Sequence, residues 1–323
     1  MSKKLLIIGN EGMVGSAIFS ALKNIKNANL EILTLNKSQL DLRDQMNVQK
    51  FFQLNKVDEV ILAAAKVGGI EANNTYPVKF LYDNLMIQNN VINSCHKSGV
   101  NKLLFLGSSC IYPRNSKQPI SESEMLSGYL EKTNEPYAVA KIAGIKLCES
   151  FNREFGRDYR TVIPTNLYGK KDNFHPENSH VIPGLINRFH DAVMNNINIV
   201  KIWGSGNQLR EFMHVDDMAS ACIFTLNLSK QKYDEVTDPM NSIVNIGTAK
   251  EIEIKLLAKM IAKITNFKGE IIFDENKPDG TPRKLLDTKK LSSLGWNYTI
   301  ELEEGIKETY FWYKENYKKT RHS

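Results

Sequence analysis

A tyrosine and a lysine four residues apart carry the sharpest chemical signal in this sequence. Tyr137 and Lys141 stand on a predicted helix next to Pro136, and residues at i and i+4 share one helix face. A phenol with an ordinary pKa of about 10 transfers protons poorly near neutrality, and lowering that pKa by about 3 units takes about 4 kcal/mol. One cation about 4 Å away supplies a similar free energy at an effective dielectric near 20. The spacing therefore predicts a proton-transferring tyrosine with a neighbouring ammonium that lowers its pKa.

A serine at the end of a predicted strand adds a third group. Ser108 follows the apolar run 102–107 and is itself followed by Ser109 and Cys110. A hydroxyl at a strand end can hydrogen-bond an oxygen on which negative charge develops. The Tyr-x-x-x-Lys spacing is common by itself, but a strand-end serine that precedes it in the chain indicates a catalytic arrangement.

A glycine-rich turn near the start of the chain has the features of a dinucleotide site. It follows the apolar run 5–8, opens a helical pattern and has the spacing GxxGxxG. Glycines allow a tight turn and close backbone approach, while a helix N-terminus presents free N–H groups to a pyrophosphate. The residues expected to contact the dinucleotide are Gly9, Asn10, Glu11, Gly12, Met13, Val14 and Gly15.

The end of the second predicted strand bears on the choice between NAD and NADP. A carboxylate there hydrogen-bonds the ribose 2′-hydroxyl, whereas a basic residue accommodates a 2′-phosphate. Segment 36–38 contains Lys37 and no acid, which favours NADP(H), while Glu11 points the other way and Lys37 could be a solvated surface lysine. The adenine and its ribose are expected to border Asp41, Leu42, Ala63, Ala64 and Ala65, with a helix cap and a packed strand end as the alternatives.

Short apolar runs alternate with helical patterns through the first half of the chain. Candidate strands lie at 5–8, 31–35, 59–63, 102–107 and 161–163, and helical patterns cover 14–23, 78–98 and 137–155. This alternation predicts an α/β protein with a Rossmann-type, doubly wound parallel sheet.

The second half of the chain has a different character. Loops rich in Pro, Gly and Asn occur at 164–184, 203–210 and 276–283. They predict a smaller, mostly C-terminal α/β substrate domain laid over the strand ends. The expected division assigns 1–165 with about 212–247 to the cofactor domain, and about 166–211 with 248–323 to the substrate domain.

Length and composition fit such an architecture. The chain has 323 residues, of which 42% are hydrophobic, enough to bury a sizeable core. Its four cysteines show neither metal-ligand spacing nor the density of a disulfide scaffold, so we expect a reducing compartment and no metal. The apolar run 5–8 is too short for a signal peptide or a membrane span, which predicts a cytoplasmic protein with no membrane partner.

The formal net charge of +6 does not by itself indicate nucleic-acid binding. Basic residues are spread along the chain, apart from a cluster within 318–322. A positive site for an acidic small molecule explains the balance equally well, and we expect no nucleic-acid partner.

Six longer motifs lie between Gly9 and about Trp312. They read AAAKVGGI at 63–70, GSSCIYP at 107–113, NEPYA at 134–138, NSHVIP at 178–183, REFMHVDD at 210–217 and PDGTPRK at 278–284. Together with the glycine turn they resemble the extended short-chain dehydrogenase/reductases and, within them, the GDP-L-fucose synthase family. The last three motifs are far more specific than the general reductase core.

The resemblance implies a mechanism. That family converts GDP-4-keto-6-deoxy-D-mannose to GDP-L-fucose by 3,5-epimerisation and then NADPH-dependent reduction at C4. By resemblance, Cys110 is the base that removes a proton beside the ketone and His180 the acid on the opposite face. Taken alone, these residues fit a buried strand-end cysteine and a hydrogen-bonding loop histidine. Tyr137 is the proton donor during reduction, which must come second because it destroys the carbonyl that acidifies the neighbouring C–H bonds.

The resemblance also implies residues that contact the two ligands. Arginine suits diphosphate and indole suits apolar ligand surface, although Arg188 could be a solvated helix residue and Trp203 a core residue. The implied substrate contacts are Ser109, Cys110, Asn166, Arg188, Trp203, Arg210, Asp279 and Lys284. Beside the nicotinamide it places Lys141, His180 and the strand end formed by Pro164, Asn166 and Leu167. It further implies a homodimer formed through helices of the cofactor domain.

Two departures from the family pattern leave alternatives open. Glu11 stands where the family commonly has an arginine for the 2′-phosphate, and Lys170 follows Gly169 where proline is usual. One alternative function is therefore C4 reduction alone, on a related GDP-4-keto sugar such as a GDP-6-deoxy-4-keto-heptose. Another is a non-catalytic protein that senses NADP.

Overall fold

The largest element of the protein is a parallel sheet of six strands. The computed structural model describes residues 2–25, 29–176, 178–276 and 281–320. Its strands run in the order β2-β1-β3-β4-β5-β9, and every neighbouring pair is parallel. Their bounds are β1 (Lys3–Ile8), β2 (Leu30–Leu35), β3 (Glu59–Leu62), β4 (Lys102–Leu106), β5 (Asp158–Pro164) and β9 (Ile243–Ile246). This sheet confirms the predicted fold class and places a topological switch point between β1 and β3, where such folds bind ligands.

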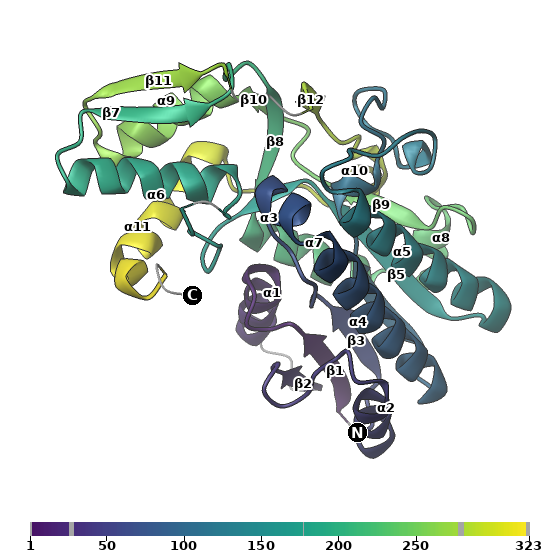
Figure 1. Ribbon diagram of the computed structural model, residues 1–323. Coiled ribbons are helices and arrows are strands. Elements are labelled where there is room, and N and C mark those ends of the chain that lie inside the picture. Colours follow the sequence, from purple (N-terminus) through teal and green to yellow (C-terminus); the bar gives the residue numbers. More distant parts are fainter. Residues whose placement is uncertain (1, 26–28, 177, 277–280, 321–323) are drawn as a thin grey trace.

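Helices cover both faces of this sheet (Figure 1). One face carries α1 (Met13–Asn24) and α7 (Val215–Asn227), and the other carries α2 (Gln45–Leu54), α4 (Pro77–Lys97) and α5 (Glu135–Phe155). Alternate residues of β1 serve the two faces, since Leu5 and Ile7 join one core cluster and Leu6 and Ile8 the other. Double coverage explains why the strands read as continuous apolar runs.

A smaller α/β part sits beside the carboxyl ends of the main strands, at the upper left of Figure 1. One of its sheets pairs β8 (Leu209–His214) with β10 (Glu251–Glu253), β12 (Arg283–Lys284) and β6 (Asn166–Tyr168), and another pairs β7 (Ile199–Trp203) with β11 (Glu270–Asp274). Three helices pack here: α6 (Val181–Met194), α9 (Ile254–Thr265) and α11 (Leu302–Thr320). A separate apolar cluster, which includes Phe189, Ile261 and Tyr313, fills the space between them.

The remaining elements are short connections. They are α3 (Ile70–Thr75), η1 (Ser109–Ile111), η2 (Glu122–Glu124), α8 (Lys230–Asp234) and α10 (Lys289–Ser293). Within the described residues, the helices include none whose length and apolar character would let it cross a membrane.

The structure corrects one strand assignment. Pro164 ends β5 as predicted, but Asn166 and Leu167 belong to a separate strand, β6, which pairs with β8 of the smaller sheet. The chain leaves the main sheet at Thr165, whose N–H still donates to Ile246 O at 2.9 Å. The expected single strand is thus two strands in two sheets.

Candidate functional site

Ser108, Tyr137 and Lys141 lie together beyond the carboxyl end of β4. The Lys141 ammonium donates to Leu106 O at 2.8 Å, and Nζ lies 4.7 Å from the Phe105 ring centroid and 5.8 Å from that of Tyr137. Ser108 is extended and caps the short helix η1, and its hydroxyl also hydrogen-bonds the Tyr137 phenol. The helix α5 and the strand β4 thereby bring together all three groups that the spacing predicted.

The protonation of this group differs from the expectation. Burial raises the pKa of Tyr137 well above its ordinary value, with the Ser108 hydrogen bond acting in the opposite direction. Burial also lowers the pKa of Lys141 to about 8. The expected lowering of the tyrosine pKa by Lys141 is therefore wrong, because the loss of solvent around the phenol dominates and the ammonium donates to Leu106 O. Tyr137 stays protonated near neutrality, which is the form that donates a proton during a reduction.

Cys110 lies on η1, close to the same group. Its N–H donates to the Ser108 hydroxyl at 3.4 Å, and its side chain is almost fully buried. Burial raises the pKa of the Cys110 thiol, while the charge of Lys284, then the Ser108 hydroxyl and then Lys141 lower it. A cysteine in this setting can act as a base if its thiolate is stabilised by the nearby cations.

His180 approaches from the start of α6, where it is the residue before the first helical turn. Its loop is held by the segment after β3: Gly69 N–H donates to Asn178 O at 3.5 Å, and a Cβ on Gly69 would overlap Ser179 O. The residue as a whole is exposed to solvent. Its ring nevertheless lies among protein atoms, and this desolvation lowers the pKa of His180; the charge of Lys284 lowers the pKa further. The charge of Lys284 thus acts in the same direction on the pKa of His180 and on that of Cys110.

The glycine turn forms a cradle at the switch point of the main sheet. Gly9 has a φ of +95°, and a Cβ on Gly15 would collide with Gly9 O, so backbone packs directly on backbone there. Gly12 precedes α1, whose first N–H groups have no side-chain cap. Asn10 Oδ1 is buried and has no partner within the described part of the chain. Free amides, a close turn and an unpaired polar atom fit a dinucleotide phosphate; Met13 and Val14 form the first turn of the helix behind it.

The second-strand end and the alanine segment flank this cradle. Ile8 pairs with Leu35, so the glycine turn and segment 36–38 leave the sheet side by side. Lys37 and Glu11 are both exposed there. On the other side, Ala63 N–H donates to Ile8 O at 2.9 Å. The backbone of Ala64 lies so close to Gly9 that a Cβ at position 9 would collide with it, and Ala65 is the next residue.

Asp41 has a partner that the sequence reasoning missed. Its carboxylate accepts from Arg43 Nη2 at 2.7 Å, and this hydrogen bond is the main cause that lowers the pKa of Asp41 to about 2. Arg43 also reaches Asp83 at 3.3 Å. The alternative reading of Asp41 as a helix cap is wrong, because Asp44 caps α2. Leu42 contributes its carbonyl to this corner by accepting from Asn90 Nδ2 at 2.9 Å.

The predicted substrate residues come from several elements of the smaller part. Arg188 on α6 lies over the Trp203 indole, 5.9 Å from the ring centroid. Trp203 is 56% exposed, so its alternative reading as a core residue is wrong. Arg210 and Lys284 lie side by side on β8 and β12. The remaining placements are Ser109 buried on η1, Asn166 half-buried on β6, and Asp279 outside the described residues.

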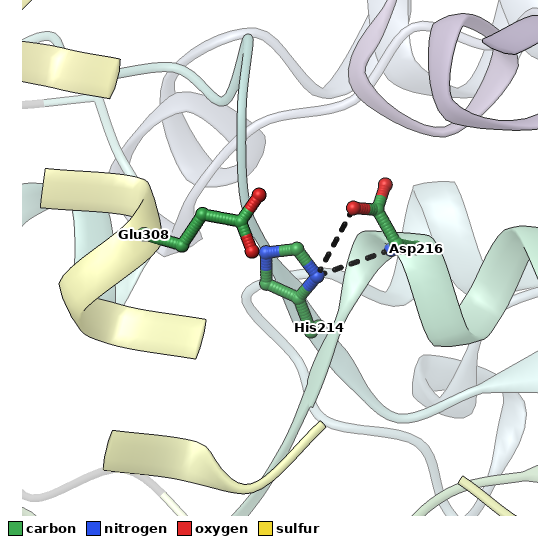
Figure 2. A group of neighbouring side chains, drawn as sticks. All are labelled: His214, Asp216 and Glu308. Carbon is green, nitrogen blue, oxygen red and sulfur yellow. Dashed lines mark hydrogen bonds and ion pairs between the residues drawn. The ribbon is translucent and has the colours of Figure 1, made fainter. Parts of the chain in front are cut away.

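A group of polar side chains that the sequence reasoning missed lies where β8 ends and α7 begins, facing α11 (Figure 2). His214 Nδ1 accepts from Asp216 N–H at 3.3 Å and lies 3.7 Å from its carboxylate, while Glu308 from α11 completes a triad that could hold a metal ion. Glu308 forms an ion pair with Lys170, whose ammonium already supplies positive charge to the triad. Lys170 is the residue that departs from the family's proline, so this cluster ties an unusual loop to α11.

Comparisons with known sequences identify the family of this chain. The model of the "NAD dependent epimerase/dehydratase family" matches residues 5–247. The chain is 56% identical over 317 residues to the GDP-L-fucose synthase of Escherichia coli K12, covering 98% of each chain.

Solved structures agree with these sequence matches. A GDP-D-glycero-L-gluco-heptose synthase from Campylobacter jejuni, determined with NADPH, superposes with a TM-score of 0.89 at 36% identity over 97% of this chain and 98% of the other. A GDP-L-fucose synthetase from Naegleria fowleri bound to NADP gives a TM-score of 0.87 at 29% identity, over 98% of this chain and 95% of the other.

Proposed function

Since this chain belongs to the NAD dependent epimerase/dehydratase family and, within it, to the GDP-L-fucose synthases, we propose which of its residues carry the reaction. The activity is 3,5-epimerisation of GDP-4-keto-6-deoxy-D-mannose and NADPH-dependent reduction at C4, giving GDP-L-fucose. The observation that carries the assignment is the meeting of Ser108, Cys110, Tyr137 and Lys141 at one strand end. His180 stands just before α6, and the charge of Lys284 lowers the pKa of both His180 and Cys110.

The cofactor NADP(H) supplies the hydride that reduces C4. The glycine cradle and Asn10 would hold its pyrophosphate, and Lys37 would face the 2′-phosphate. The adenosine would lie near Asp41, Leu42 and the alanine segment 63–65. Pro164, Asn166 and Leu167 would border the nicotinamide, together with Lys141 and His180.

The epimerisation uses protons beside the C4 ketone. The Cys110 thiolate removes a proton from C3 or C5 and becomes a thiol, while the electron pair moves onto the C4 oxygen. The hydroxyls of Ser108 and Tyr137 hydrogen-bond that oxyanion. His180, protonated, returns a proton to the opposite face of the same carbon and so restores the ketone with inverted configuration.

The reduction uses the same oxygen. As hydride reaches C4, Tyr137 donates its phenolic proton to the C4 oxygen, and the ketone becomes an alcohol. The raised pKa of Tyr137 keeps this proton in place until the carbonyl oxygen gains negative charge. Lys141, buried on the same helix face, then stabilises the phenolate that remains.

The GDP-sugar is proposed to lie over the smaller part of the molecule. Arg188 and Arg210 are suited to its diphosphate, and the exposed Trp203 indole offers a flat apolar surface. Further contacts are assigned to Ser109, Asn166, Asp279 and Lys284. This assignment follows the division into a cofactor domain of 1–165 with about 212–247 and a substrate domain of about 166–211 with 248–323.

We propose a homodimer in the cytoplasm for this enzyme. Helices α4 and α5 pack side by side on the outer face of the main sheet (Figure 1). They expose large apolar side chains, including Val78, Tyr82 and Val139, as an interface between two copies requires. All four cysteines are free and buried, which suits a reducing compartment. Light scattering after size-exclusion chromatography would give twice the chain mass if the dimer forms.

C4 reduction without epimerisation is the second candidate function. The structural match to a heptose synthase, together with the Lys170–Glu308 pair in the loop after β6, supports C4 reduction of a related GDP-4-keto heptose without epimerisation. Because the chain is an enzyme of this family, we reject the hypothesis that it is a non-catalytic protein that senses NADP.

One incubation separates the two functions. GDP-4-keto-6-deoxy-D-mannose is mixed with the enzyme in D2O, first without and then with NADPH, and C3 and C5 are followed by NMR. Deuterium at both carbons, followed by GDP-L-fucose once NADPH is added, is the expected result. NADPH oxidation without deuterium incorporation would establish a pure C4 reductase and remove Cys110 and His180 from catalysis.

A further inference from the structure

The loop between β6 and α6, which ends at His180, is tied together by its own hydrogen bonds. Asn173 Nδ2 donates to Asn178 O at 3.3 Å, and Asn178 N–H donates to His175 Nδ1 at 3.2 Å. His175 N–H in turn donates to Asn173 Oδ1 at 3.0 Å. These bonds join the two arms of the loop, so the position of its last residue depends on where the loop as a whole is attached.

The end of this loop lies against the segment that follows β3. A Cβ on Gly69 would lie 2.9 Å from Ser179 O, and a Cβ on Gly68 would lie 3.0 Å from the ring of Phe80 on α4. That ring stands edge-on to the Tyr137 ring, with the two centroids 6.2 Å apart. Direct contacts therefore connect the end of the loop to the proposed proton donor, through two glycines and one ring.

The other side of the loop is anchored by Phe174. Its side chain is only 1% exposed. Its ring centroid lies 4.5 Å from that of Tyr313 and 6.1 Å from that of Trp312, both on α11. The Phe174 carbonyl also accepts a hydrogen bond from Asn187 Nδ2 on α6. A buried aromatic ring removes a large apolar area from water, so this residue attaches the loop firmly to both helices.

Helix α11 is itself fixed against α6 (Figure 1). Tyr317 Oη donates to Asp191 Oδ1 at 2.6 Å. The His190 ring stands edge-on to the Tyr313 ring, with centroids 5.3 Å apart. Because Tyr313 also contacts Phe174, the loop and the two helices meet at one ring. The support beneath the loop is therefore part of the apolar core of the smaller domain.

We propose that Phe174 is a positioning residue that holds the end of the loop against the segment after β3, so that His180 can act in epimerisation. The proposal rests on the proposed role of His180, and it makes α11 a support of that step. Reduction at C4 does not depend on this anchor, because Tyr137 and Lys141 stand on α5 and Lys141 donates to Leu106 O on β4.

The test compares Phe174→Ala with a matched control, Phe267→Ala. Phe267 is also buried, and its ring lies 5.3 Å from that of Phe189 in the same core cluster. GDP-4-keto-6-deoxy-D-mannose is incubated with each folded enzyme in D2O, and NMR follows inversion of configuration at C3 and C5. Phe174→Ala should invert these carbons about 10²-fold more slowly than the wild type, the loss expected for a misplacement of about 1 Å.

Two further readouts separate positioning from a general loss of structure. NADPH oxidation with a substrate already epimerised should stay close to the wild-type rate in Phe174→Ala. Deuterium that enters with retained configuration, through Cys110 alone, should fall less than inversion does. Phe174→Leu keeps an apolar side chain in the same place and should restore most of the inversion rate. Phe267→Ala should change inversion and reduction to the same extent.

Wild-type inversion by Phe174→Ala would overturn the proposal, because the loop would then be held by its other attachment, the exposed Lys170–Glu308 pair. A parallel loss of inversion and reduction would also overturn it, since Phe174 would then be an ordinary core residue. If Phe174→Ala does not fold, the same two criteria are applied to Phe174→Leu. Failure of the proposed function is a separate result, namely wild-type inversion by His180→Gln.

Discussion

The proposed active site has two centres that would act on one ketone, and they are built differently. The proposed reduction centre (Ser108, Tyr137, Lys141) comes from the end of the main-sheet strand β4 and from the helix α5 that packs on this sheet. The proposed epimerisation centre (Cys110, His180) is drawn from η1 and from the residue that precedes α6. The first is fixed by the core of a single sheet, whereas the second also depends on where the loop before α6 lies over that sheet.

The difference teaches how one activity can change without the other. A shift of the loop before α6 would move His180 and leave the Lys141 bond to Leu106 O untouched. Relatives of similar structure act on different GDP-sugars, such as the heptose synthase with a TM-score of 0.89. We infer that substrate and stereochemistry are set in the smaller part, while hydride transfer is set in the sheet. The following predictions are ordered by the size of the expected effect.

The largest effect is expected for Tyr137→Phe. Removing the proton donor of the reduction centre should lower the rate of NADPH oxidation by about 10³-fold, within the usual range for a general acid. Binding of NADPH, measured by its fluorescence, should change little because the phenol is aimed at the sugar. Wild-type turnover by this variant would show that another group protonates the C4 oxygen.

The next largest effect is expected for Cys110→Ala, which should impair epimerisation and not reduction. Deuterium incorporation at C3 and C5 should fall by about 10²-fold, while NADPH oxidation with a substrate already epimerised should stay within about tenfold of wild type. Cys148→Ala provides the matched control, since that cysteine is buried away from the site. Equal loss of both activities in Cys110→Ala would mean that the centres cannot be separated.

A pH-dependent effect on stability is expected in the loop that leads to His180. Burial raises the pKa of Asp172 from 3.8 to about 7. A carboxyl whose pKa is raised in the fold stabilises it below the unfolded pKa, and this contribution is lost as pH rises through about 7. Asp172→Asn should therefore raise the free energy of unfolding by about 1–2 kcal/mol near pH 8 and little near pH 4. Denaturant titration at both pH values measures this, and equal effects at both would contradict it.

The smallest effect is expected in the cofactor cradle. Glu11 is exposed beside the second-strand end that carries Lys37, and its negative charge opposes a 2′-phosphate. Glu11→Arg should raise the preference for NADPH over NADH by about tenfold, which corresponds to about 1.4 kcal/mol. The ratio of kcat/KM for the two cofactors measures it. Glu11→Gln should give a smaller rise in the same direction, and an unchanged ratio in both variants would place the 2′-phosphate elsewhere.

The same division explains what the sequence could predict. Main-sheet strands such as Leu5–Ile8 are buried on both faces, and so their apolar runs are continuous and visible. The strands β10 and β12 have two or three half-buried residues each, which gives no periodic signal. The Asp41–Arg43 and Lys170–Glu308 pairs were also missed, because long-range contacts and local charge pairs leave no distinctive pattern. The tyrosine pKa was predicted in the wrong direction because spacing shows a neighbouring cation but not the loss of solvent.

The most direct test of the two-centre account is deuterium exchange by Tyr137→Phe. The variant is incubated with GDP-4-keto-6-deoxy-D-mannose and NADPH in D2O, and NMR follows C3 and C5 while absorbance follows NADPH. The account predicts deuterium at both carbons at a rate within about tenfold of wild type, since Ser108 still hydrogen-bonds the oxyanion, with almost no NADPH oxidised. Loss of exchange in parallel with loss of reduction would contradict it and show that a single centre performs both steps.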